Sequence, residues 1–172
     1  MHREGHVGAA LALYAPVGFL AFVSGFRSLA VLGAVGAVAL AMLPDQDMRI
    51  PFVSHRGITH TVWFALLVAA VLGAAGVYLG REMGAVGVNG ATGAAVVGGY
   101  AALVGFVTIV SHIAADALTP MGVKPFAPVR GRKYTVALAT ASNPVANYAL
   151  LLLGGGLAVG ALVVAARMTG TG

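Results

Sequence analysis

Five long stretches without a charged residue dominate this sequence and limit what it can fold into. They cover residues 7–26, 28–44, 61–80, 83–111 and 134–166. A helix needs about 20 apolar residues, with a range of roughly 17–25, to cross a bilayer, and each stretch is long enough. Hydrophobic residues make up 59% of the chain and charged residues only 9%, which excludes a soluble domain. The sequence therefore predicts an all-α integral membrane helical bundle with about five transmembrane helices.

Proline and polar residues set the expected ends of these spans within one domain, residues 1–172. The spans are expected at about 7–25, 28–43, 60–79, 92–117 and 145–166. Pro44 ends the second span and Pro144 precedes the fifth, because proline lacks the amide donor that a helix interior needs. Thr59 is expected to cap the third span. The segment 120–143 is predicted to be a surface loop with a short interfacial helix at about 134–141.

The first apolar stretch is also compatible with a secretory signal peptide, because Arg3 precedes it. Glu4 and His6 are unusual in such a leader, and no convincing small-x-small cleavage site precedes Arg27. We therefore favour a retained span.

Glycine placement predicts close contacts between helices, since small residues let two backbones approach each other in a membrane. Glycine is also simply common in membrane helices, which is the alternative explanation for any single pair. The glycines that indicate contacts are Gly76 and Gly80, Gly98 and Gly99, and Gly156 and Gly160.

Basic residues are unevenly divided between the two ends of the predicted bundle. The N-terminal side would carry Arg3, Arg49, Arg56, Lys124, Arg130, Arg132 and Lys133, and the other side only Arg27, Arg81 and Arg167. The positive-inside rule then places the N-terminus in the cytoplasm. The net charge of +5 favours attraction to anionic lipid headgroups. Nucleic-acid binding is not expected, because no basic run interleaved with aromatic residues is present.

Histidines and aspartates converge on that same cytoplasmic face. Odd-numbered spans contribute their beginnings and even-numbered spans their ends. The residues are His6, Asp45, Asp47, His55, His60, His112 and Asp116. Ionisable groups in membrane segments are costly and usually functional. The chain has no cysteine, so a metal would be held by imidazole and carboxylate groups. The pattern predicts a site for one or two divalent metal ions, with zinc favoured and manganese or iron as alternatives.

The spacing of these residues suggests individual roles. His112 and Asp116 are four residues apart, which puts both on one helical face. Asp45 and Asp47 lie in a turn that can aim both carboxylates inward, and one of them can act as general base instead of ligand. Arg56 is suited to bidentate contact with a phosphate and would neutralise charge on a substrate. The alternative for Arg56 is an anchor in the lipid headgroups.

These motifs resemble the YdjM-like family of inner-membrane-associated metal-dependent hydrolases. The resemblance rests on an N-terminal histidine, Pro-Asp-x-Asp at 44–47, His-Arg-Gly-x-Thr-His at 55–60 and His-x-x-x-Asp-x-x-Thr-x-x-Gly at 112–122. It covers residues 6–128 and departs from the family pattern at Gln46, where family members often have an aliphatic residue. It implies a bound divalent metal and a hydrolytic activity. The order of the ligands is also distantly similar to that of zinc-dependent phospholipases C, which hints at phosphoester substrates.

The sequence is best interpreted as a membrane-bound metal-dependent hydrolase with its site at the cytoplasmic side of the inner membrane. Metal-activated water would attack a phosphoester or ester bond, and the site's level at the headgroups favours a lipid or lipid-linked substrate. Two other functions use the same residues. One is an ion- or metal-coupled transporter, whose site is expected nearer the bilayer midplane. The other is a non-catalytic scaffold that binds a cytoplasmic partner.

Overall fold

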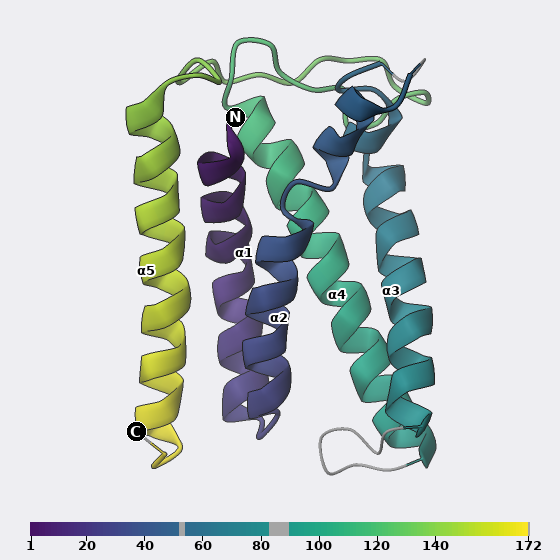
Figure 1. The fold of residues 1–172 in the computed structure, drawn as a ribbon, viewed down its shortest axis with the longest axis vertical. Coiled ribbons are helices and arrows are strands. Elements are labelled where there is room, and N and C mark those ends of the chain that lie inside the picture. The colour runs from purple at the N-terminus through teal and green to yellow at the C-terminus, as the bar shows by residue number, and fades with distance from the viewer. Residues whose placement is uncertain (52–53, 83–89, 172) are drawn as a thin grey trace.

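The computed structural model describes residues 1–51, 54–82 and 90–171, which form a bundle of long helices (Figure 1). The long helices are α1 (Arg3–Val23), α2 (Arg27–Leu40), α3 (Val62–Glu82), α4 (Gly90–Ala117) and α5 (Pro144–Met168). Two short 3₁₀ helices, η1 (Pro44–Arg49) and η2 (Ile58–His60), lie between α2 and α3. Five spans, with α2 and η1 counted as one, are long and apolar enough to cross a membrane. The all-α, five-span prediction is confirmed for the described residues.

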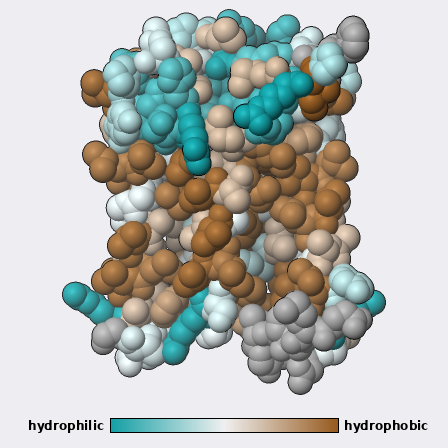
Figure 2. All heavy atoms as spheres, in the orientation of Figure 1, coloured by the Kyte–Doolittle hydropathy of each residue, from teal (hydrophilic) through white to brown (hydrophobic). Residues whose placement is uncertain are grey.

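The outer surface of the bundle carries a wide apolar band between two polar ends (Figure 2). Large aliphatic side chains project from it, among them Leu152, 76% exposed, and Leu32, 64% exposed. Soluble proteins rarely expose apolar patches of this extent. The band therefore faces lipid hydrocarbon, and the two polar ends lie at the level of the headgroups.

The helices pack as two close pairs, α3 with α4 and α1 with α5, while α4 crosses the bundle diagonally and also contacts α1 and α2 (Figure 1). The predicted glycine contacts between α3 and α4 are confirmed at three positions. A Cβ at Gly76 would lie 2.8 Å from the Val97 carbonyl oxygen, and one at Gly80 would lie 2.8 Å from the Gly93 carbonyl oxygen. Gly98 packs directly against Val77, whereas Gly99 meets no atom of the described chain within 4 Å.

The contact between α1 and α5 uses a glycine that the spacing did not single out. A Cβ at Gly154 would overlap the carbonyl oxygen of Gly8, so the two backbones touch. The prediction for Gly156 and Gly160 is wrong, since a Cβ at either position would have no atom of the described residues within 4 Å. Successive helical residues are 100° apart, so Gly156 faces away from α1 when Gly154 faces it.

Two local predictions are also wrong. The segment 134–141 forms no helix, because its amides bond elsewhere: Tyr134 pairs with Val123, and Val136 N donates to Ala117 O at 2.8 Å. Thr61, and not Thr59, caps α3 by accepting a hydrogen bond from Phe64 N at 3.3 Å. The Thr59 hydroxyl donates instead to Asp47 Oδ2, at 2.6 Å. The hydrogen bonds of both segments join the loops to the helix ends, at the end of the bundle where the N-terminus lies.

Candidate metal centre

Four segments far apart in the sequence bring their histidines and aspartates together at one end of the bundle. His6 lies in the first turns of α1, Asp45 in η1, His60 at the end of η2, and His112 and Asp116 near the end of α4. All five side chains are buried. Antiparallel packing of consecutive helices produces this convergence, since helices that run in opposite directions place alternate termini at one end. The convergence expected from the sequence is therefore present for these five residues.

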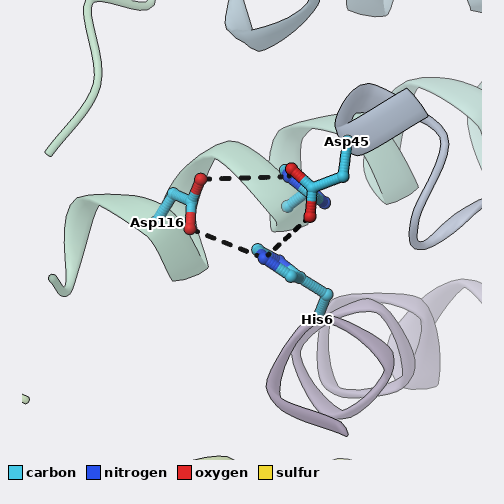
Figure 3. A group of neighbouring side chains, drawn as sticks. His6, Asp45 and Asp116 are labelled. Atoms are coloured by element: carbon cyan, nitrogen blue, oxygen red, sulfur yellow. Dashed lines mark ion pairs between the residues drawn. The ribbon is translucent and has the colours of Figure 1, made fainter. Parts of the chain in front are cut away.

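Ligand atoms of four of these residues, His6, Asp45, His112 and Asp116, all lie within 4.8 Å of one another. His6 Nε2 is 3.5 Å from Asp116 Oδ1 and 3.8 Å from Asp45 Oδ2, so the two carboxylates approach one imidazole from different sides (Figure 3). His112 Nε2 is 3.3 Å from Asp45 Oδ1 and 3.9 Å from Asp116 Oδ2. Ligands of a tetrahedral zinc ion, each about 2.0–2.2 Å from it, lie roughly 3.3–3.6 Å apart. The donor atoms thus have the spacing of a metal site.

Several buried atoms of this group that could bind a metal have no hydrogen-bond partner among the described residues. They are both ring nitrogens of His6 and Oδ2 of Asp116. Buried polar atoms are normally satisfied, and an orphaned one costs about 1–3 kcal/mol. A divalent cation bound between them would satisfy the imidazole lone pair and the carboxylate oxygen together. The residues present therefore fit a metal ion.

The orientation of His112 is set by a backbone group outside the cluster. Its Nδ1 lies 2.7 Å from the carbonyl oxygen of Ala41. A carbonyl oxygen can only accept, so Nδ1 carries the proton and Nε2 presents its lone pair to the cluster. Metal-binding histidines commonly have their second ring nitrogen held in this way. His6 stacks on His112 with ring centroids 3.6 Å apart, which holds the two imidazoles parallel.

His60 joins the four-residue group to a second set of donors, Asp45, His55 and His60. Its Nε2 lies 3.2 Å from Asp45 Oδ1 and 3.4 Å from Asp116 Oδ2. Burial by itself lowers the pKa of His60, but the contacts with Asp116 and Asp45 outweigh burial and raise the pKa above its usual value. The same two carboxylates would also attract a metal cation. Asp45 belongs to both sets and can bridge two ions.

Asp47 and His55 lie at the outer edge of the cluster. Asp47 accepts from Thr59 and from the Arg56 amide, and its Oδ1 is 3.0 Å from His55 Nδ1. The His55 side chain is 36% exposed. Asp47 Oδ2 is also 3.4 Å from His60 Nδ1, so Asp47 lies between His55 and His60. Asp47 is not a member of the four-residue group.

Arg56 lies directly against the cluster. Its Nη2 donates to Asp116 Oδ1 at 2.8 Å, and its Nη1 donates to Thr119 Oγ1 at 3.0 Å and to Gly122 O at 3.1 Å. Its backbone has φ of +59°, in the left-handed region that is uncommon for a residue other than glycine. Such strain is found at sites where the surrounding structure fixes a functional side chain.

Three contributors were not singled out as site residues from the sequence. Thr119 accepts from Arg56 and donates to the Asp116 carbonyl oxygen, and its place in the 112–122 motif is the signal that could have identified it. Asn147, buried near the start of α5, accepts from the His2 amide and so holds the beginning of α1. The α-amino group of Met1 contacts Asp116. For Asn147 the sequence gives no comparable signal, because it is a lone asparagine next to an apolar run.

Comparison with known proteins identifies one family. The family model described as "YdjM inner membrane protein" matches residues 1–170. No curated protein and no solved structure matches the chain. These comparisons agree with the resemblance drawn from the motifs, whereas they give no support to the similarity with zinc-dependent phospholipases C.

Proposed function

Since the chain belongs to the YdjM inner membrane protein family, we propose that its buried histidines and aspartates form a divalent-metal centre for hydrolysis at the membrane surface. The observation that carries this proposal is the four-residue group His6, Asp45, His112 and Asp116, buried and with unpartnered donor atoms. The two carboxylates together carry the charge that balances a divalent cation, and the two imidazoles add neutral nitrogen ligands. The mixed nitrogen and oxygen ligand set favours zinc, with manganese or iron as alternatives.

The chemistry follows from the groups around the cluster. A divalent ion held there supplies a Lewis acid and lowers the pKa of a bound water to about 7. Asp45 and Asp116 would supply the carboxylate ligands, and the His112 tautomer is fixed by Ala41. The exposed His55, held by Asp47, is placed to move a proton between the cluster and bulk water. Arg56 supplies a fixed positive charge on the side of Asp116.

The position of the cluster supports a substrate that reaches it along the membrane. It lies at one end of the helices, below the connecting segments, and not at the bundle centre, where transporter sites usually lie. The bundle end that holds it also carries seven of the ten lysines and arginines of the chain, which supports a cytoplasmic location. A lipid or lipid-linked molecule with an ester or phosphoester bond at headgroup level fits this location.

The test begins with elemental analysis of the detergent-purified protein. We expect one or two divalent ions per chain in the wild type and loss of most of this metal in His112→Ala. His2→Ala is the matched control, because His2 lies outside both donor groups and should retain the metal. A panel of phosphoesters and carboxylic esters then tests hydrolysis by the metal-loaded protein. A wild-type protein that holds no metal even after zinc supplementation would refute the proposal.

A further inference from the structure

A pocket with basic residues in its lining opens beside the metal centre, at the bundle end that carries the long 120–143 loop. It has a volume of about 250 Å³ and is lined by His55, Arg56, Met121, Gly122, Val123, Lys124 and Lys133. Three further pockets lie along the helices and are lined almost entirely by aliphatic, alanine and glycine residues. The pocket at the bundle end is different, because three of its lining side chains are permanently cationic and none is acidic.

Backbone pairing brings the two lysines of this pocket together from opposite sides of the loop. Val123 N donates to Tyr134 O at 3.0 Å and Tyr134 N donates to Val123 O at 2.8 Å, which forms an antiparallel bridge. Lys124 and Lys133 are the next residues along the two segments, so they lie opposite each other. Like charges in this arrangement repel and destabilise the pairing. Neither lysine forms an ion pair with an acid of the described chain, so the repulsion is not offset by protein groups.

Glycine at position 122 keeps this arrangement compact. Gly122 has φ of +60°, and a Cβ there would lie 2.5 Å from the Tyr134 carbonyl oxygen and 3.0 Å from Cε of Lys133. The Lys133 side chain therefore crosses directly over Gly122, whose carbonyl oxygen accepts from Arg56. Lys124, Lys133 and Arg56 thus line the same pocket.

Arg56 forms the inner wall of the pocket and connects it to the metal centre. Its side chain is 9% exposed, and its Nε is buried without a hydrogen-bond partner in the described chain. Asp116 neutralises one positive charge of the wall, so the excess charge comes from Lys124 and Lys133. A phosphate group carries about −1.5 to −2 charges as a monoester at neutral pH. The two lysine charges that no acid offsets match this charge. The edge of the Arg56 guanidinium and its free Nε–H offer hydrogen bonds to the phosphate oxygens.

We propose that this pocket is a phosphate-binding subsite, formed by Lys124, Lys133 and Arg56, which holds the phosphate of a membrane-lipid headgroup or a free phosphate next to the metal centre. The assignment rests on the proposed function for its role, because it names the chemical class of the substrate. Binding itself requires no metal. The subsite and the hydrolytic function can therefore fail separately.

The test measures binding to metal-depleted protein in a nonionic detergent by calorimetry, with inorganic phosphate and with dihexanoyl phosphatidic acid as separate probes. The double variant Lys124→Gln/Lys133→Gln should bind at least about tenfold more weakly, since hydrogen bonds to charged groups are each worth about that factor. The matched control is Arg130→Gln/Arg132→Gln, which removes equal charge from the same loop outside the pocket and should change affinity by less than about twofold.

The two probes identify the source of the phosphate. Lysine-dependent binding of both probes supports recognition of the phosphate group itself, whereas lysine-dependent binding of the lipid alone supports a headgroup site. The proposal is overturned if the wild type binds neither probe, if the lysine variant binds normally, or if both double variants weaken binding equally. Unchanged melting temperatures of the variants serve as the check on folding. Metal content, measured on the same preparations, separately decides the proposed metal centre.

Discussion

Arg56 donates a 2.8 Å hydrogen bond from Nη2 to Oδ1 of Asp116, and this contact joins the metal centre to the loop above it. The other terminal nitrogen of Arg56 reaches Thr119 and the carbonyl oxygen of Gly122. One planar guanidinium therefore fixes a buried carboxylate and the start of the 120–143 segment at the same time. The geometry depends on a fork of donors, and a single ammonium group cannot reproduce it.

Replacing Arg56 by lysine should separate metal binding from catalysis. Arg56→Lys keeps the positive charge near Asp116, so we expect metal content close to that of the wild type. Activity on a phosphorylated substrate should fall at least about tenfold, since two-pronged contact is lost. Arg49→Lys, at an exposed position in η1, is the control and should be fully active. Full activity of Arg56→Lys would show that catalysis does not need the fork of donors at this position.

Asp116, inside the four-residue group, and Asp47, outside it, should respond differently to loss of charge. Asp116→Asn removes an anionic donor from the four-residue group, so metal affinity should fall well beyond the roughly 10–100-fold that is typical of residues that only support ligands. Asp47→Asn should stay within that range, because Asp47 contacts His55, Thr59 and the Arg56 amide. Competition with a chelator of known affinity measures both. Equal losses would mean that Asp47 is itself a ligand.

Metal affinity should increase with pH through the raised pKa of His60. The Asp116 and Asp45 carboxylates favour the protonated imidazole in the metal-free protein, and metal must displace that proton. Affinity should therefore continue to rise above about pH 6.5, the usual histidine value, and level off only above the raised pKa. The same shift stabilises the metal-free fold at low pH, and this stability is lost as pH rises through the folded-state pKa. Chelator competition at several pH values provides the measurement, and a plateau already reached below the usual histidine value would contradict it.

The crossing of α1 and α5 should be sensitive to a single methyl group. Gly154→Ala places a Cβ against the Gly8 carbonyl oxygen, and overpacking of this kind costs about 1–3 kcal/mol. Gly156→Ala adds the same methyl group where the described chain leaves open space, so it should change stability little. Thermal unfolding in detergent distinguishes the two variants. Because α1 also carries His6, Gly154→Ala should bind metal more weakly as well.

The orientation in the membrane can be tested with single cysteines, because the natural chain has none. Ile50→Cys and Phe126→Cys lie at the metal end, and Met168→Cys lies at the other end, all at exposed positions. A membrane-impermeant maleimide applied to spheroplasts should label position 168 directly, and positions 50 and 126 only after permeabilisation. Labelling of positions 50 and 126 from opposite sides would rule out a single site formed by both loops.

The number and direction of the helices could be predicted because they depend on properties of contiguous sequence. Apolar length determines which stretches cross the bilayer, and consecutive crossings of one bilayer must alternate in direction. Together these two properties are enough to place His6, Asp45, His60, His112 and Asp116 at one end of the bundle. The prediction required no knowledge of side-chain orientation.

Details that depend on distant contacts could not be predicted in the same way. Asp45 and Asp47 are two residues apart in one turn, yet only Asp45 belongs to the donor groups, because η1 turns Asp47 toward His55. The glycine pairs at 76 and 80 and at 156 and 160 have the same spacing, but only the first meets another helix. The pairing of Val123 with Tyr134, which brings Lys124 and Lys133 together, leaves no local pattern in the sequence.

The distribution of the donors over α1 to α4 also determines when during biosynthesis the site can form. His6 leaves the ribosome early, but Asp116 follows only after more than half of the chain, on the order of ten seconds later at usual translation rates. No metal can be fully coordinated until the fourth span has entered the membrane. The last span, α5, packs on α1 through Gly154 and Gly8 and leaves the ribosome later still. On the proposed function, loading with metal would be a late event of assembly, and a chain interrupted before α4 would lack two of the four ligands.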